Sequence, residues 1–162
     1  EHLPPFATVT RAEKIARLRE AMTKRGAAWH FVSTLDDVAW LLNLRGADVA
    51  YNPVFLAHAL VGPSEIVLFV GEEKIAPELR ARLAADGVRV APYEDAKRAL
   101  AALPEGAKLL VDPGRVTLGL TESVPAHATI VEAANPTVLF KACKTEGARR
   151  ALRVARRCSR AR

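Results

Sequence analysis

The chain has 162 residues, half of them apolar, and a formal net charge of +6. This length and composition predict one globular domain with a single core. The longest nearly uncharged stretch, residues 51–64, is too short and too interrupted to span a membrane, and no secretory signal begins the sequence. The cysteines, Cys143 and Cys158, lack metal-site spacing and are typical of a reduced setting, so we expect a cytoplasmic protein without a membrane partner.

The positive charge is concentrated near the end of the sequence. Seven of the 24 Lys and Arg residues, but only one of the 18 Asp and Glu residues, lie in residues 145–162, so the rest of the chain is neutral. The pI near 9.7 therefore does not indicate a nucleic-acid-binding body. A polyanion-binding tail remains an alternative. No aromatic residue lies among its arginines to stack on bases, so nucleic acid is not the expected partner.

The first elements alternate between helix and strand. Thr10 and Glu13 have the spacing of a capping box, and Gly26 ends the helix that follows it. An apolar run with β-forming residues, 28–33, predicts a strand. Thr34 is then expected to cap a second helix, which ends in the stretch NLRGAD.

The alternation continues to the end of the body. Apolar runs at residues 54–61 and 66–70, joined by a Gly-Pro turn, predict an antiparallel pair of strands. Further helices are expected at 77–86, 94–103 and 117–122, and further strands at 88–92, 108–112 and 129–133. Asn135-Pro136 marks a boundary at which proline opens another helix. This order predicts an α/β domain with a mixed β-sheet between helix layers.

Motifs that would carry chemistry are absent. The glycines do not have the spacing of a phosphate-binding loop, and the four histidines form no HxxH or HExxH pair. His30 and His58 lie in predicted strands among apolar neighbours, which is typical of structural histidines. Asp112, at a strand end before Pro-Gly, is typical of an aspartate that bonds its own turn. We therefore expect no metal or cofactor in this chain.

One polar stretch, NLRGADVAYN at residues 43–52, interrupts the apolar segments and is called the polar island below. Arg45, Asp48 and Asn52 could face a cleft completed by another domain, where they would orient a peptide or hold the two domains together. In the alternative interpretation they build the loop itself: Arg45 pairs with Asp48, Gly46 adopts a positive φ, and Asn52-Pro53 fixes the turn into the next strand.

The segment LDDVAWLLNLRGADVAYNPVF, residues 35–55, resembles LDEIAWLxNLRGxDxxxNPVF in the middle domain of three-domain Xaa-Pro aminopeptidases. The stretches LLVDPG and NPTVLFKACK extend the resemblance over most of the chain. It implies the creatinase/prolidase N-terminal fold, with a ribonuclease H-like motif. Enzymes of this kind cleave the bond before a proline at position two of a peptide. They use two divalent ions, usually manganese, held by a C-terminal "pita-bread" domain, so the resemblance transfers no metal ligand to this chain.

The resemblance also divides the chain. Residues 1–140 correspond to the creatinase/prolidase N-terminal-like domain, and residues 141–162 to a linker and a basic helix that is shorter and more arginine-rich than the family pattern. Three functions stay open: a non-catalytic domain of a metallo-aminopeptidase, a stand-alone binding or assembly module, and a polyanion binder. The expected partners are the catalytic domain and a peptide with proline at position two, and a homo-oligomer is left open.

Overall fold

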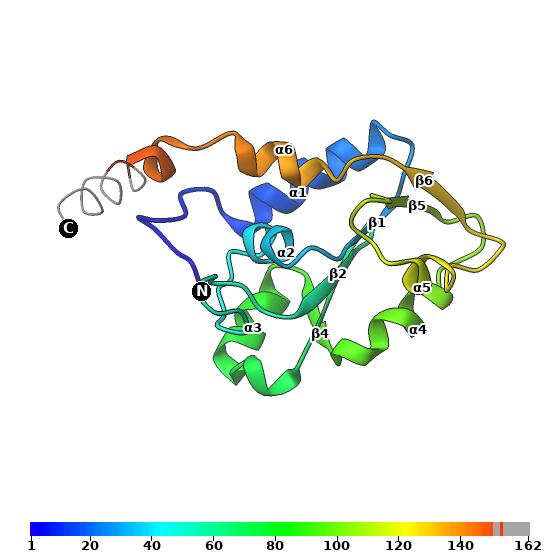
Figure 1. The fold of residues 1–162 in the computed structure, drawn as a ribbon, viewed down its shortest axis with the longest axis horizontal. Coiled ribbons are helices and arrows are strands. Elements are labelled where there is room, and N and C mark those ends of the chain that lie inside the picture. The colour runs from blue at the N-terminus through cyan, green and yellow to red at the C-terminus, as the bar shows by residue number, and fades with distance from the viewer. Residues whose placement is uncertain (151–152, 154–162) are drawn as a thin grey trace.

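The computed structural model describes residues 1–150 and residue 153. Its centre is a six-stranded sheet in the order β4-β3-β2-β1-β5-β6 (Figure 1). The strands are β1 (Trp29–Val32), β2 (Ala57–Val61), β3 (Ile66–Val70), β4 (Val88–Ala91), β5 (Lys108–Val111) and β6 (Thr129–Glu132). Strand β2 runs antiparallel to both of its neighbours, and all other pairs are parallel. The mixed sheet predicted from the sequence is therefore confirmed.

Helices cover both faces of this sheet. The helices are α1 (Arg11–Thr23), α2 (Leu35–Leu41), α3 (Pro77–Ala85), α4 (Ala96–Ala101), α5 (Leu118–Thr121) and α6 (Pro136–Ala142), with 3-10 turns η1 (Glu72–Lys74) and η2 (Tyr93–Asp95). Side chains of α1, α2 and α3 pack into one core, and those of α4 and α5 into a second core on the opposite face. No helix in the described part of the chain is long and apolar enough to cross a membrane.

Local sequence signals explain most element boundaries. Thr10 Oγ1 accepts a hydrogen bond from the Glu13 amide at 3.2 Å, and Glu13 Oε2 accepts one from the Thr10 amide at 2.8 Å. This confirms the predicted capping box, and Gly26 follows the helix with a φ of 71°. Thr34 occupies the N-cap of α2 as predicted, but its hydroxyl donates to the Asp37 carboxylate and accepts no hydrogen bond from the backbone amides of the helix.

The predicted hairpin forms between β2 and β3, with a continuous antiparallel register from Ala57 opposite Val70 to Val61 opposite Ile66. Strand β2 starts at Ala57 and not at Val54, where the apolar run begins. The reason is that Pro53 and Val54 use their carbonyls to accept hydrogen bonds from the polar island. The apolar run is thus divided between a loop and a strand.

A buried hydrogen-bond network joins the end of the sheet to α2 and α6. Asn135 Oδ1 accepts bonds from the Thr137 amide at 3.0 Å and hydroxyl at 2.8 Å and lies 3.1 Å from His30 Nε2. Asn135 Nδ2 donates to Asp37 at 3.2 Å, and its backbone amide donates to Asp112 at 2.9 Å. His30 is a satisfied core histidine, as predicted, because its Nδ1 bonds the Leu110 carbonyl at 2.9 Å. Asp112 also bonds the Gly114 amide, as expected for its turn.

The charged side chain of Lys141 also takes part in this network. Its ammonium donates to Asp37 at 2.7 Å and also to Asp36, and Asp37 is fully buried. Burial alone would lower the pKa of Lys141, but the two carboxylates raise it above its ordinary value. The ion pairs therefore hold α6 against α2 in the charged state.

We predict that Asn135→Ala lowers the free energy of unfolding by about 2–4 kcal/mol, because it leaves several buried polar partners unpaired. The exposed Asn52→Ala is the matched control, and its effect should stay within about 0.5 kcal/mol. Urea denaturation of both variants and the unchanged chain measures the difference. Equal loss in the two variants would show that the network does not stabilise the fold.

Candidate functional site

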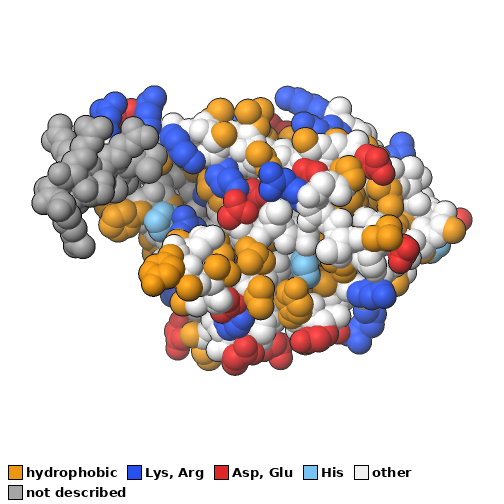
Figure 2. Space-filling view, in the orientation of Figure 1, with side chains coloured by type: hydrophobic (Ala, Val, Ile, Leu, Met, Phe, Trp, Pro, Cys, Tyr) orange, Lys and Arg blue, Asp and Glu red, His pale blue; other side chains and the backbone are white. Residues whose placement is uncertain are grey.

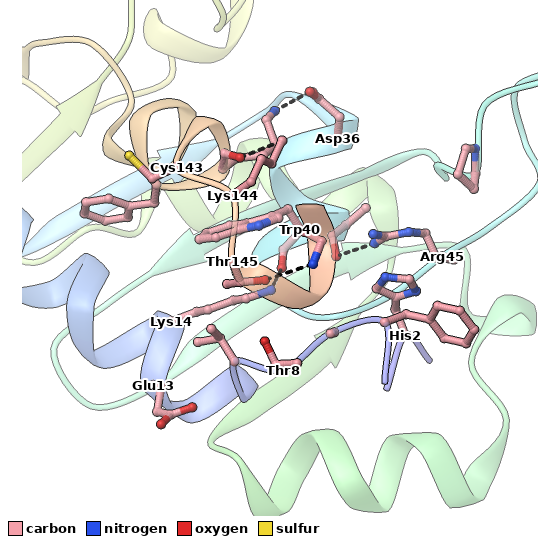
Figure 3. Close-up of a pocket in the computed structure, with 18 of the residues that line it drawn as sticks. His2, Thr8, Glu13, Lys14, Asp36, Trp40, Arg45, Cys143, Lys144 and Thr145 are labelled. Carbon is pink, nitrogen blue, oxygen red and sulfur yellow. Dashed lines mark hydrogen bonds and ion pairs between the residues drawn. The ribbon is translucent and has the colours of Figure 1, made fainter. Parts of the chain in front are cut away.

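A groove that borders the polar island has a volume of about 440 Å³. Figure 3 shows its side chains converging from the N-terminal segment (residues 2–9), α1, α2 and the chain that follows α6. The polar island contributes Arg45 and Asn52 to the lining, but not Asp48. The structure thus brings two of the three predicted site residues to one groove.

Arg45 is anchored to the end of α2. Its Nη1 donates to the carbonyls of Leu44 at 2.7 Å and Ala39 at 3.3 Å. The Ala39 carbonyl, which also accepts the Leu44 amide at 2.9 Å, lies near the C-terminus of α2, where partial negative charge favours a guanidinium. Burial lowers the pKa of Arg45, although the group remains a cation at any physiological pH. The anchor fixes the orientation of the guanidinium at the groove.

Asp48 does not pair with Arg45 but stabilises the loop. Its Oδ2 accepts a bond from the Leu56 amide at 2.7 Å and pairs with Lys74 Nζ at 2.6 Å. The hydrogen bond from Lys74, followed by that from Leu56, holds the pKa of Asp48 below its ordinary value. The predicted Arg45–Asp48 pair is therefore wrong. Arg45 instead bonds the carbonyls of Leu44 and Ala39, and Asp48 pairs with Lys74, 26 residues away, which sequence proximity cannot reveal.

Gly46 is required for space and not for a positive φ. A Cβ at this position would lie 2.6 Å from the Phe55 Cβ and 3.1 Å from the Val54 carbonyl oxygen. The positive φ values of the region occur at Asn43 (53°) and Tyr51 (61°). The expectation that Gly46 supplies a left-handed conformation is wrong, because the glycine instead lets two chain segments approach closely.

Asn52 closes the turn of the polar island with its backbone. Its amide donates to the Val49 carbonyl at 3.1 Å, and its carbonyl accepts from the Val54 amide at 2.8 Å. The expected turn at Asn52-Pro53 is thus present. The Asn52 side chain is exposed at the groove, where it can meet a ligand or another domain.

Sequence reasoning missed Lys14, the central cation of the groove. Lys14 is only 6% exposed, and its ammonium donates to the Trp40 carbonyl at 2.7 Å and to Asn43 Oδ1 at 2.5 Å. It also lies 4.3 Å from the centre of the Trp40 ring. Burial, then the nearby charges of Arg45 and Arg11, lower the pKa of Lys14 to about 8. Its position beside Ile15 and four residues before Leu18, on the inward face of α1, was the available signal.

The chemistry of the remaining titratable groups is limited. In residues 1–150 and 153, no group of three or more His, Cys, Asp or Glu side chains is placed to hold a metal ion. Ser33 Oγ lies 3.1 Å from His58 Nδ1, and the His58 ring stacks on Tyr93 with centroids 4.9 Å apart. Burial lowers the pKa of His58, which keeps the ring neutral near pH 7. His58 is the sheet-face histidine that the sequence predicted.

Comparison of this sequence with known proteins identifies its family. Residues 1–147 match the creatinase/prolidase N-terminal domain family. The chain is 38% identical to Xaa-Pro aminopeptidase 1 of Dictyostelium discoideum over 135 residues, which cover 83% of this chain and 21% of that protein. It is 37% identical to a probable Xaa-Pro aminopeptidase P of Neosartorya fischeri over 154 residues, covering 90% of this chain and 23% of the relative. The chain thus spans about a quarter of the length of these relatives.

Solved structures show the same fold. The X-prolyl aminopeptidase of Caenorhabditis elegans, described as a cytosolic enzyme with a di-nuclear active site, superposes with a TM-score of 0.79 at 24% identity. That match covers 88% of this chain and 24% of the enzyme. The aminopeptidase P of Streptococcus thermophilus superposes with a TM-score of 0.57 at 8% identity, over 81% of this chain and 98% of that one.

We predict that Gly46→Ala lowers the free energy of unfolding by about 1–3 kcal/mol, because the added methyl group overlaps Phe55. Gly119→Ala is the control, since a Cβ there meets nothing within 4 Å. It should be neutral or slightly stabilising because alanine is the better helix former. Urea midpoints of the two variants provide the comparison. A neutral Gly46→Ala would contradict the close approach seen in the loop.

Lys14 should make stability depend on pH. Its pKa is about 8 in the folded chain against an ordinary 10.5, so between these values the unfolded chain binds more protons. The free energy of unfolding should therefore rise as the pH increases from about 8 toward 10.

Denaturation at several pH values tests this effect. The free energy of unfolding of the unchanged chain, minus that of Lys14→Met, should become more positive over that interval, because the variant lacks this titration. Lys24→Met, at an exposed position of the same helical segment, should follow the unchanged chain in parallel. If the free energy of unfolding of Lys14→Met changed with pH in parallel with that of the unchanged chain, the lowered pKa of Lys14 would be contradicted.

Proposed function

Because this chain belongs to the creatinase/prolidase N-terminal domain family, we propose that it is the non-catalytic N-terminal-side domain of a metal-dependent Xaa-Pro aminopeptidase. The observation that carries this proposal is the similarity to proteins named Xaa-Pro aminopeptidase over 83–90% of the chain. The reaction would be removal of the residue that precedes a proline at position two. The chain spans only about a quarter of those relatives, so the catalytic groups would lie in another part of such an enzyme.

The metal site belongs to that other part in this proposal. The C. elegans enzyme is described as having a di-nuclear active site, which supports two divalent ions in the complete enzyme, and manganese is the proposed metal. In the complete enzyme such ions would supply a Lewis acid that activates a water molecule and polarises the scissile carbonyl. The described residues of this chain do not fit the role of ligands, because no suitable cluster of side chains occurs among them.

The proposed contribution of this chain is made by the polar island. Arg45 and Asn52 would face the catalytic domain or the bound peptide, and Asp48 would hold the loop that carries them. The Nη1 anchor of Arg45 supports this role, because it fixes the guanidinium before any partner arrives. Among the described residues, no hydrogen bond engages Arg45 Nε or Nη2, so these donors are available to a carboxylate or a carbonyl.

The proposal also covers the domain boundaries of this chain and its location in the cell. Residues 1–140 would form the family domain, and residues 141–162 would lead toward the catalytic domain. The described part of that linker contains the end of α6 and a helical segment at residues 146–150, while most of the predicted basic helix lies outside the described residues. A cytoplasmic location is proposed because the C. elegans relative is described as cytosolic.

The first test uses an Xaa-Pro tripeptide with added manganese. The chain of 162 residues alone should release no N-terminal residue. Turnover that co-purifies with this chain through several columns would overturn the proposed non-catalytic role.

The second part of the test uses a longer enzyme that contains this domain. Arg45→Ala should lower kcat/KM for Xaa-Pro peptides about tenfold or more while the domain stays folded. Arg25→Ala is the matched control, because Arg25 also donates to a carbonyl near a helix end, Ala21 at 2.9 Å, but lies outside the groove. An unchanged kcat/KM for Arg45→Ala would remove the polar island from the proposed site.

A further inference from the structure

We propose that the groove between residues 2–9, α1, α2 and residues 143–148 binds an acidic segment of another polypeptide. Carboxylates of that segment would pair with Arg45 and Arg17, and an apolar side chain would enter between them. This binding activity is separate from the proposed aminopeptidase role and requires neither metal nor catalysis. It follows from the charge balance, the unpaired cations and the shape of the groove.

The charge balance of the lining is strongly positive. The basic side chains that line the groove are Lys14, Arg17, Arg45, Lys141 and Lys144, against the acidic Glu13 and Asp36. Both acids are already engaged, since Glu13 completes the capping box with Thr10 and Asp36 pairs with Lys141. In Figure 2, Lys and Arg side chains are spread over the upper side and the centre of the molecule, with some at the lower right, whereas Asp and Glu side chains are frequent along its lower edge. A negatively charged partner therefore fits the groove.

Three cations that line the groove lack a counter-charge. Within the described residues, no ion pair includes Lys14, Arg45 or Arg17. Lys14 is 6% exposed and is held only by neutral oxygens and the Trp40 ring. A buried cation without a carboxylate is costly, and Arg45 nearby increases that cost. A carboxylate supplied by a partner would relieve both charges at once.

Apolar side chains also line the groove and form a surface on which an apolar side chain of the partner can pack. Phe6, Trp40, Pro53, Val54 and Phe140 contribute to the lining. Phe6 is 62% exposed and stacks on His2, with ring centroids 5.9 Å apart. Figure 3 shows Trp40 beside Lys14 in this groove, which Arg45 also lines. An apolar side chain flanked by acidic residues therefore matches the site better than a fully polar anion does.

The same contacts argue against nucleic acid as the occupant. Stacking of successive bases requires several free aromatic faces. Lys14 lies over the Trp40 ring at 4.3 Å and the Arg17 guanidinium over the Phe140 ring at 4.0 Å, which leaves Phe6 as the exposed ring. The basic end of this chain is also a poor occupant, because residues 145–162 contain seven arginines and one acid. An acidic polypeptide remains as the occupant that satisfies charge and shape.

Fluorescence anisotropy with the whole chain tests the proposal. The probe is a labelled synthetic peptide that repeats Glu-Glu-Leu, compared with a Lys-Lys-Leu peptide and a short oligothymidylate. The acidic peptide should bind saturably at low salt, more weakly at high salt, and far better than the basic peptide. Arg45→Gln and Arg17→Gln should each weaken this binding about tenfold.

Controls distinguish loss of the site from loss of the fold. Arg25→Gln removes an equivalent guanidinium outside the groove and should bind like the unchanged chain. Arg17 is exposed and stacks on one ring only, so Arg17→Gln should leave the circular dichroism and the melting curve unchanged. The proposal is overturned if the acidic peptide does not bind, if the basic peptide binds equally, if oligothymidylate displaces it, or if both groove variants retain full affinity.

Discussion

The buried amide of Asn135 is the interaction on which the arrangement of this domain depends. It lies where the end of the sheet meets α2 and α6. The side chain bonds Asp37 and Thr137 and lies 3.1 Å from His30 Nε2, and the backbone amide of the same residue donates to Asp112. An amide can donate and accept in fixed directions, so one side chain satisfies acceptors and donors from several elements. Within the described residues, no buried side-chain nitrogen or oxygen lacks a partner. Such a network specifies one packing of α6 and no other.

This packing has consequences for the surface. Helix α2 starts at the buried network, through Asp37, and ends at the carbonyls that anchor Arg45. Helix α6 is held to α2 by Lys141, and the chain after α6 forms one wall of the groove. The polar core therefore positions the α2 and α6 side of the groove, while hydrogen bonds of Asn43 to His2 and Val9 hold the wall formed by residues 2–9. A change in the core would move both walls relative to each other.

The groove and the aminopeptidase proposal place Arg45 in two complementary roles. In a longer enzyme, a rigid guanidinium could meet the catalytic domain or the peptide. In the isolated chain, the same group belongs to a cationic groove whose own acids are already engaged. Both roles use the same physical feature, a cation fixed by backbone carbonyls and left without a carboxylate. The activity of a longer enzyme and the binding of acidic peptides by this chain are separate measurements of that feature.

The sequence by itself determined the alternation of helices and strands, the capping box at Thr10, the β2–β3 hairpin and the helix opened by Asn135-Pro136. These features follow from spacing and from local backbone preference, which act over a few residues. It also indicated that Arg45 and Asn52 lie on a special loop. Only the tertiary structure decided their partners: Asp48 pairs with Lys74, 26 residues away, and Gly46 is needed because Phe55 packs against it. The buried cation Lys14 was likewise decided by packing, since its surroundings come from α2 and the polar island, and no local pattern encodes contacts between distant segments.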